Sequence, residues 1–210
     1  MLHEIPGAVG RLEALLDDPG EPRAAVVFAH PHPQMGGTMH TKVVYQGAKA
    51  LARIGCAVLR FNFRGVGTSA GSFDDGRGEK DDMRDALNFM HDRYPELPLW
   101  AAGMSFGSWV GLTVGAEDAR VSALIGVSMP VVRYDFTAVA ETSKAKFFIH
   151  GERDEITSLK DARAFYARAA EPKELAVIDA ADHLFDGKVS EVADTLEDLL
   201  GDWPGVRETP

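Results

Sequence analysis

The chain of 210 residues is long enough to bury a full hydrophobic core, and at this length we expect one domain over residues 1–210. Its formal net charge of −10, without a cluster of lysine and arginine, argues against a nucleic-acid partner. No run approaches the roughly 20 apolar residues that a membrane-spanning helix needs, and the single cysteine, Cys56, excludes an intrachain disulfide.

Short apolar runs alternate along the chain with longer amphipathic patterns. We expect an additional edge strand in GRLEALL (residues 10–16), followed by regular alternation of strands and helices. In chain order these predicted elements are a strand at 24–30, a helix near 39–54, a strand at 57–63, a helix near 79–93, a strand at 98–103, a helix near 106–116, strands at 122–128 and 145–151, a helix near 158–170, a strand at 174–179 and a helix near 187–200. The alternation predicts an α/β fold, a three-layer αβα sandwich with a mostly parallel sheet covered on both faces.

Two segments match the G-x-S-x-G pattern of a nucleophile elbow, GVGTSAG around Ser69 and GMSFG around Ser105. An elbow requires a strand that ends abruptly, a strained turn and a helix that begins at once. Ser105 meets these requirements, whereas Ser69 lies six residues beyond the predicted strand end at Phe63 and precedes a polar run. We therefore predict that Ser105 is the nucleophile and that GVGTSAG is a tight surface loop whose glycines take positive φ.

These segments, together with HPHP and RFNFRGVG, resemble the α/β-hydrolase superfamily, and within it small lidless serine hydrolases of the dienelactone-hydrolase-like or Xaa-Pro-dipeptidyl-peptidase-like branch. The resemblance extends from about Ala24 to His183 and implies an α/β-hydrolase fold without a cap domain. It also implies that the R-G-x-G-x-S loop is structural and lies across the oxyanion strand from the nucleophile. The residues that match this loop are Arg64, Gly65, Gly67 and Ser69.

Chain order predicts the other catalytic residues, since an acid and then a histidine follow the serine in α/β-hydrolases. His183 follows the last predicted strand and suits the base, whereas His150 lies within an apolar run and is expected to be structural. The turn after strand 145–151 offers three carboxylates, Glu152, Asp154 and Glu155. The resemblance to a G-x-x-D pattern at this turn selects Asp154, and we expect Asp182 to be a loop or capping group. Asp154 would then orient His183, which takes the proton of Ser105.

An oxyanion hole needs two backbone N–H donors, and Phe106, directly after Ser105, should supply one. The second should come from the segment HPHPQMGG after strand 24–30. Because proline has no N–H, the donor is His32, or otherwise Gln34 or a residue beyond it. The resemblance to an H-G-x oxyanion turn selects His32, with Pro31 in the glycine position.

The connection between strands 122–128 and 145–151 has only about 16 residues, too few for a helical cap domain. We therefore expect an open, shallow cleft and a serine hydrolase that cleaves small or short-acyl carboxylic esters through an acyl-enzyme. A thioesterase, a dipeptidase-like amide hydrolase and a non-catalytic binding module on the same scaffold remain alternatives. Apolar residues that flank the motifs are candidates for the pocket wall: Met35, Met104, Trp109, Met129, Val131, Leu184 and Phe185.

We expect no cofactor and no metal, because no acidic residue has suitable spacing to complete a site with His30, His32 and His40. An acidic run lacks calcium-loop spacing and should cap and solubilise the following helix: Asp74, Asp75, Glu79, Asp81 and Asp82. The N-terminal segment has no basic stretch before an apolar core, so we expect no secretory signal and a cytoplasmic location. The expected partner is a small-molecule ester substrate, with no nucleic acid and no membrane, for a monomer or a homodimer.

Overall fold

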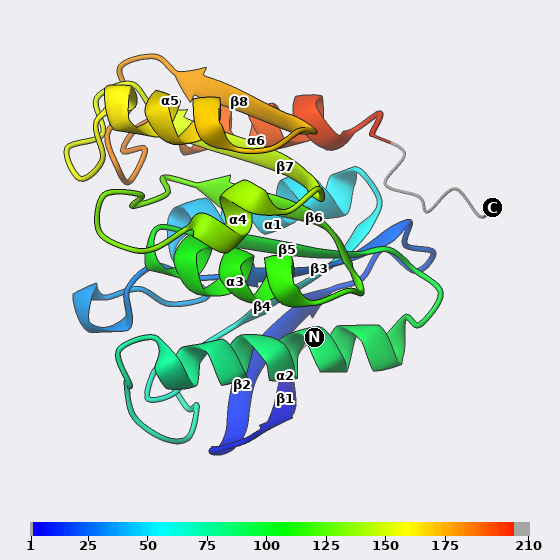
Figure 1. Ribbon diagram of the computed structural model, residues 1–210. Helices are drawn as coiled ribbons and strands as arrows, with labels where there is room; N and C mark the ends of the chain where they lie inside the picture. The colour runs from blue at the N-terminus through cyan, green and yellow to red at the C-terminus, as the bar shows by residue number, and fades with distance from the viewer. Residues whose placement is uncertain (1, 204–210) are drawn as a thin grey trace.

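The computed structural model describes residues 2–203 as three layers, in which helices cover both faces of an eight-stranded sheet (Figure 1). The strands are β1 (Leu2–Gly7), β2 (Gly10–Asp17), β3 (Ala24–Ala29), β4 (Cys56–Phe61), β5 (Leu99–Met104), β6 (Val121–Val127), β7 (Ala145–Gly151) and β8 (Lys173–Ile178). Their order in the sheet is β1-β2-β4-β3-β5-β6-β7-β8. β1 and β2 pair antiparallel to their neighbours and the others are parallel, so the predicted fold class is confirmed.

The helices form the two outer layers, and each layer has its own apolar core. They are α1 (Lys42–Arg53), α2 (Arg77–Arg93), α3 (Phe106–Glu117), α4 (Thr137–Glu141), α5 (Leu159–Arg168) and α6 (Val189–Leu200), with a 3-10 turn at Pro33–Met35. α1 and α6 cover one face, and α2 to α5 cover the other (Figure 1). Along β3, Val27 faces the α2–α5 core and Phe28 faces the α1–α6 core, which explains why the central strands are apolar at nearly every position.

The N-terminal hairpin changes one prediction. GRLEALL forms β2 as a strand, but β1 pairs along its outer side and takes the edge of the sheet. β2 alternates buried and partly exposed positions, and this period-2 pattern made it recognisable, whereas LHEIPG has a proline and no such alternation. No helix within residues 2–203 combines the length and apolar character needed to cross a lipid bilayer.

The GVGTSAG loop after β4 is built by backbone conformation and hydrogen bonds. Gly65, Gly67 and Gly71 have φ of 73°, 58° and 80°, as predicted for a tight loop. The Ser69 hydroxyl donates to the Asn62 carbonyl oxygen at 2.7 Å and accepts the Glu13 N–H at 2.9 Å. Ser69 therefore joins β2 to β4, and β3 separates this loop from β5.

The acidic run before and within α2 has two different roles. Glu79 accepts the N–H groups of Asp74 and Gly76 at 2.9 and 2.7 Å, which confirms the predicted capping. Asp82 is fully buried and pairs with the Arg64 guanidinium at 2.7 Å, and Glu79 is fully buried as well, so the prediction that these two residues solubilise the helix is wrong. Burial raises the pKa of Asp82, and the hydrogen bonds from Arg64 oppose this increase. The pair fixes the GVGTSAG loop against α2.

Candidate active site

Ser105 lies at the sharp turn between β5 and α3, with φ of 53° and ψ of −122°. This conformation, with positive φ, is sparsely populated for serine. A Cβ at Gly103 would collide with the Gly107 carbonyl oxygen, and one at Gly107 with the His30 carbonyl oxygen. The glycines two residues before and after Ser105 therefore let the strand, the helix and the loop after β3 approach one another.

Three predicted residues from distant parts of the chain meet in one hydrogen-bonded row. Ser105 Oγ lies 2.9 Å from His183 Nε2, and His183 Nδ1 lies 2.8 Å from Asp154 Oδ2. Asp154 follows β7 and His183 follows β8, and both side chains are buried. Because an ionised carboxylate can only accept, Nδ1 carries the proton and Nε2 is free to accept the serine hydroxyl.

The acid of this row is held as a carboxylate. Its second oxygen accepts the N–H groups of Ile156 and Thr157 at 2.8 and 2.9 Å. Burial acts to raise the pKa of Asp154, but the hydrogen bonds from His183, Thr157 and Ile156 outweigh it, and the pKa lies below its ordinary value of 3.8. Asp154 is therefore charged at neutral pH and suited to orient an imidazole.

Two residues that sequence reasoning did not assign to the site support its loops. Glu155 accepts the His183 backbone N–H at 3.2 Å through Oε2. His150, predicted to be structural, points its Nε2 at the Thr157 carbonyl oxygen at 2.9 Å and thus donates to the turn that carries Asp154. Asp182 accepts the N–H of Leu184 at 3.1 Å, in agreement with its predicted loop role.

The predicted oxyanion donors are His32, in the loop after β3, and Phe106, directly after Ser105. Phe106 is the first residue of α3, so its N–H has no acceptor within the helix. The His32 carbonyl oxygen accepts the N–H groups of Met35 and Gly37 at 3.0 and 3.1 Å, which closes a tight turn. Neither the His32 nor the Phe106 N–H bonds a protein acceptor within the part of the chain that the structure describes. A Cβ at Gly37 would collide with the Pro31 carbonyl oxygen, so this turn depends on glycine.

His30 is committed to the scaffold below the site. Its Nδ1 donates to the Pro31 carbonyl oxygen at 2.6 Å, and its Nε2 accepts the Phe63 N–H at 3.1 Å, so the ring joins the ends of β3 and β4. Burial lowers the pKa of His30 to about 4 and keeps it neutral. Among residues 2–203, no three histidine, cysteine, aspartate or glutamate side chains group as ligands for a metal ion.

Ser105 and His183 open into a cavity of about 190 Å³. Two of the predicted pocket residues line it, and both are exposed at its rim: Met35 is 76% and Leu184 49% exposed. His32, Pro130, Arg133, Tyr134, Glu155 and Ile156 complete most of the wall. The short helix α4 does not form a cap over this opening, which suits the predicted shallow cleft.

The other predicted pocket residues do not line the cavity, and proximity to a motif was a poor guide to side-chain direction. Met104 alternates with Gly103 along β5 and points into the α1–α6 core, where Phe185 also lies. Met129 is buried in the α2–α5 core, against which Trp109 and Val131 pack.

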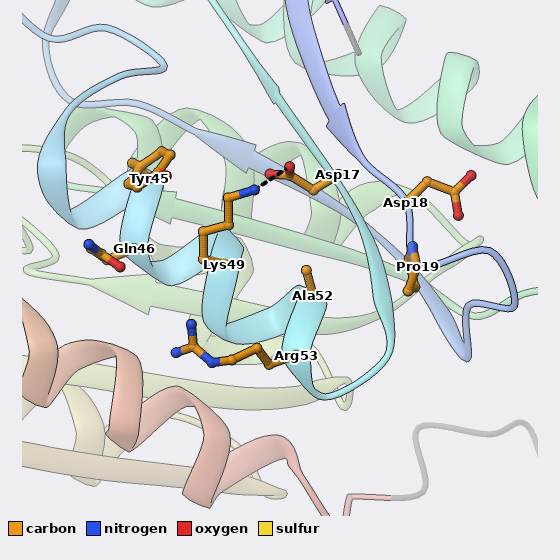
Figure 2. Close-up of a pocket in the computed structure, with 8 residues that line it drawn as sticks. All are labelled: Asp17, Asp18, Pro19, Tyr45, Gln46, Lys49, Ala52 and Arg53. Carbon is orange, nitrogen blue, oxygen red and sulfur yellow. Dashed lines mark hydrogen bonds and ion pairs between the residues drawn. The ribbon is translucent and has the colours of Figure 1, made fainter.

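A larger hollow of about 540 Å³ lies between α1 and the end of β2 and contains none of the three hydrogen-bonded residues (Figure 2). Its charges pair with neighbouring groups, since Lys49 bonds Asp17 at 2.7 Å and Arg53 pairs with Glu197. Tyr45 lies on its wall. The hollow therefore has no reactive arrangement comparable with the row at Ser105.

Comparisons with known proteins agree with this geometry. A family model described as "Serine aminopeptidase, S33" matches residues 20–147. A Rickettsia prowazekii protein, RP471, is 33% identical over 204 residues, covering 92% of this chain and 86% of that protein. The structure of an α/β serine hydrolase homologue from Coxiella burnetii is 34% identical with a TM-score of 0.90, covering 95% of this chain and 97% of the other. XC6422 from Xanthomonas campestris, described as an α/β serine hydrolase without lid, is 33% identical with a TM-score of 0.90. The match covers 100% of this chain and 96% of the XC6422 chain.

Proposed function

The chain belongs to the serine aminopeptidase S33 family of α/β serine hydrolases, and from this premise we propose that it is a carboxylesterase for small or short-acyl esters. The observation that carries the proposal is the row from Asp154 through His183 to Ser105, with distances of 2.8 and 2.9 Å. A strained serine at the start of a helix, bonded to a histidine that a carboxylate orients, is the arrangement that acyl transfer requires.

In the proposed reaction, Ser105 Oγ attacks the ester carbonyl carbon while His183 Nε2 takes the hydroxyl proton. The N–H groups of His32 and Phe106 stabilise the oxyanion of the tetrahedral intermediate. His183 then gives its proton to the departing alcohol, and the acyl group remains on Ser105. A water molecule then attacks the acyl carbonyl while His183 takes a proton from the water. When the second tetrahedral intermediate collapses, the acid is released and His183 returns the proton to Ser105 Oγ. Asp154 stays ionised and holds the imidazole throughout.

The shape of the cavity supports short acyl groups. A volume of about 190 Å³ accommodates a small ester but encloses no long chain. The exposed side chains of Met35 and Leu184 lie at the rim, and the β6–β7 connection contains a single helix of five residues, α4, which does not line the cavity. A longer acyl chain would therefore leave the protein surface after a few carbons.

Amide hydrolysis is the second candidate, because the matching family is described as a serine aminopeptidase. The same residues would cleave an amide, provided that His183 protonates the departing amine. Comparison of kcat/KM over matched acyl esters, thioesters and aminoacyl amides separates these activities. We expect the esters to be the preferred members of the panel.

The direct test is labelling by a fluorophosphonate probe together with hydrolysis of p-nitrophenyl butyrate. Ser105→Ala should lose both signals and keep the far-UV circular dichroism of the fold. Ser69→Ala, which changes the other G-x-S-x-G serine, should retain labelling and most of the activity, with lower stability because two hydrogen bonds are lost. Persistent labelling of the Ser105→Ala variant would refute the assignment.

A further inference from the structure

The last residue of β6 and the residue after it contact two members of the hydrogen-bonded row at once. The Val127 carbonyl oxygen accepts the Ser105 N–H at 2.9 Å. Ser128 Oγ donates to the His183 carbonyl oxygen at 2.9 Å. β6 lies between the strand that leads to Ser105 and the two strands that precede Asp154 and His183. These two consecutive residues therefore connect the nucleophile and the base through a single rigid strand.

Ser128 is itself fixed with little freedom. Its N–H donates to the Ile149 carbonyl oxygen of β7 at 3.0 Å, and its side chain is fully buried. Its φ is 46°, a left-handed conformation that glycine adopts at lower cost than serine. A buried hydroxyl needs a hydrogen-bond partner within the protein, and the Ser128 hydroxyl finds it in the His183 carbonyl oxygen. A strained backbone thus aims one hydroxyl at the loop that carries the base.

The other hydrogen bonds of His183 do not duplicate the bond from Ser128. Its backbone N–H donates to Glu155, an exposed side chain, at 3.2 Å. Its ring bonds Asp154 and Ser105. The carbonyl bond from Ser128 is therefore the one backbone contact of His183, among the described residues, that comes from a fully buried side chain.

We propose that Ser128 is a positioning residue, whose hydroxyl holds the His183 loop at the distance from Ser105 that proton transfer requires. The proposal rests on the proposed function, since it gives Ser128 a role through the His183 base. Ser128 is fully buried and does not line the cavity at Ser105, so its loss should lower kcat while KM stays nearly constant. A displacement of the imidazole by about 1 Å can lower a rate roughly 100-fold, and we expect kcat to fall at least about tenfold.

Two variants separate positioning from stability. Ser128→Ala removes the hydroxyl and keeps the strain of a Cβ at positive φ, whereas Ser128→Gly removes the hydroxyl and relieves that strain. The glycine variant should melt about 2–4 °C above the alanine variant. If the hydroxyl positions His183, both variants should nevertheless lose kcat to a similar extent at 25 °C, and their rates of fluorophosphonate labelling should fall in parallel.

Ser122→Ala is the matched control. Ser122 lies on the same strand, and its hydroxyl contacts the Leu99 carbonyl oxygen at 3.4 Å, at the opposite end of β6 from the site. Its loss should leave kcat and labelling within about twofold of the wild type, as expected when no transition-state contact is removed.

The outcomes differ for the two proposals. If the wild type labels and hydrolyses esters but both Ser128 variants keep wild-type kcat, the positioning role is refuted and the esterase function stands. Activity that follows melting temperature, with Ser128→Gly close to wild type, would also refute it, because stability alone would then explain the loss. If the wild type neither labels nor hydrolyses any ester, the proposed function fails, and the role of Ser128 fails with it.

Discussion

His30, which is buried directly after β3, should make the stability of the fold measurably sensitive to acid. His30 has a pKa of about 4 in the folded protein, against its ordinary value of 6.5, because burial disfavours the charged ring. Between these two values the unfolded chain binds a proton that the folded protein does not. By linkage, the free energy of unfolding therefore falls as the pH falls through this interval, and the contribution of neutral His30 is fully present above pH 6.5.

The size of this effect follows from the interval between the two pKa values. At about 1.36 kcal/mol per pH unit, the full interval corresponds to roughly 3 kcal/mol, and about 2 kcal/mol should be lost between pH 7.5 and pH 5. Against a typical total of 5–15 kcal/mol, such a loss is easily measured. Burial also lowers the pKa of His32 and His150, so the wild type alone does not isolate His30.

His30→Gln isolates the contribution of His30. The amide oxygen can accept the Phe63 N–H that His30 Nε2 accepts, but the side chain does not titrate. Urea denaturation of both proteins at pH 7.5, 6.5, 5.5 and 5.0 gives the two stability curves. We expect the variant to be less stable at pH 7.5 and the difference to shrink by about 2 kcal/mol toward pH 5. Parallel curves over this range would show that His30 does not carry the acid sensitivity.

Three further predictions concern activity. The acid limb of kcat/KM for p-nitrophenyl butyrate should rise between about pH 5 and 8, because His183 must be neutral to accept the serine proton; Asp154, with its lowered pKa, stays charged over this range, and a flat profile would exclude a histidine base. Gly37→Ala should lower kcat about tenfold or more with little change in KM, because its Cβ forces apart the turn that carries the His32 N–H. Across p-nitrophenyl esters from acetate to palmitate, kcat/KM should peak at about two to six carbons, since each further methylene adds its roughly 0.8 kcal/mol only where the protein buries it; a steady rise beyond twelve carbons would require an apolar groove that the rim of Met35 and Leu184 does not form.

The parallel strands and Ser105 could be predicted because their signals are local, whereas the residues alone left Glu152, Asp154 and Glu155 open and the resemblance to a G-x-x-D turn selected Asp154. Continuous apolar runs identify strands buried on both faces, and the backbone needs of an elbow distinguish Ser105 from Ser69 within a few residues of sequence. The same is true of His183, which follows the last strand. Each of these predictions depends on one segment and on the rule that carboxyl ends of parallel strands share an edge.

Pairings between segments could not be predicted in this way. Asp82 has the same sequence context as its surface neighbours, and its burial follows from Arg64, which lies in the loop before α2. Met104 stands next to Ser105 in sequence, but its side chain lies in the α1–α6 core and does not line the cavity. The bond from Ser128 to His183 crosses 55 positions, and serine at the end of a strand gives no sign of its positive φ. Such features depend on side-chain direction and tertiary partner, which one sequence does not specify.

The loops around Ser105 are fixed mainly by backbone in contact with backbone. A Cβ at Gly107 would collide with the His30 carbonyl oxygen, directly after β3. A Cβ at Gly37, further along the same loop, would collide with the Pro31 carbonyl oxygen. Gly151 makes a similar close approach to the Ala181 carbonyl, between the turn of Asp154 and the loop of His183. Because interiors packed this closely cannot absorb an added methyl group without shifting, small changes at these glycines move reacting atoms that they do not touch. Substitutions at the exposed rim of the cavity meet no such constraint, so in the proposed esterase the rim can change the range of acyl groups while the distances between Ser105, His183 and Asp154 stay constant.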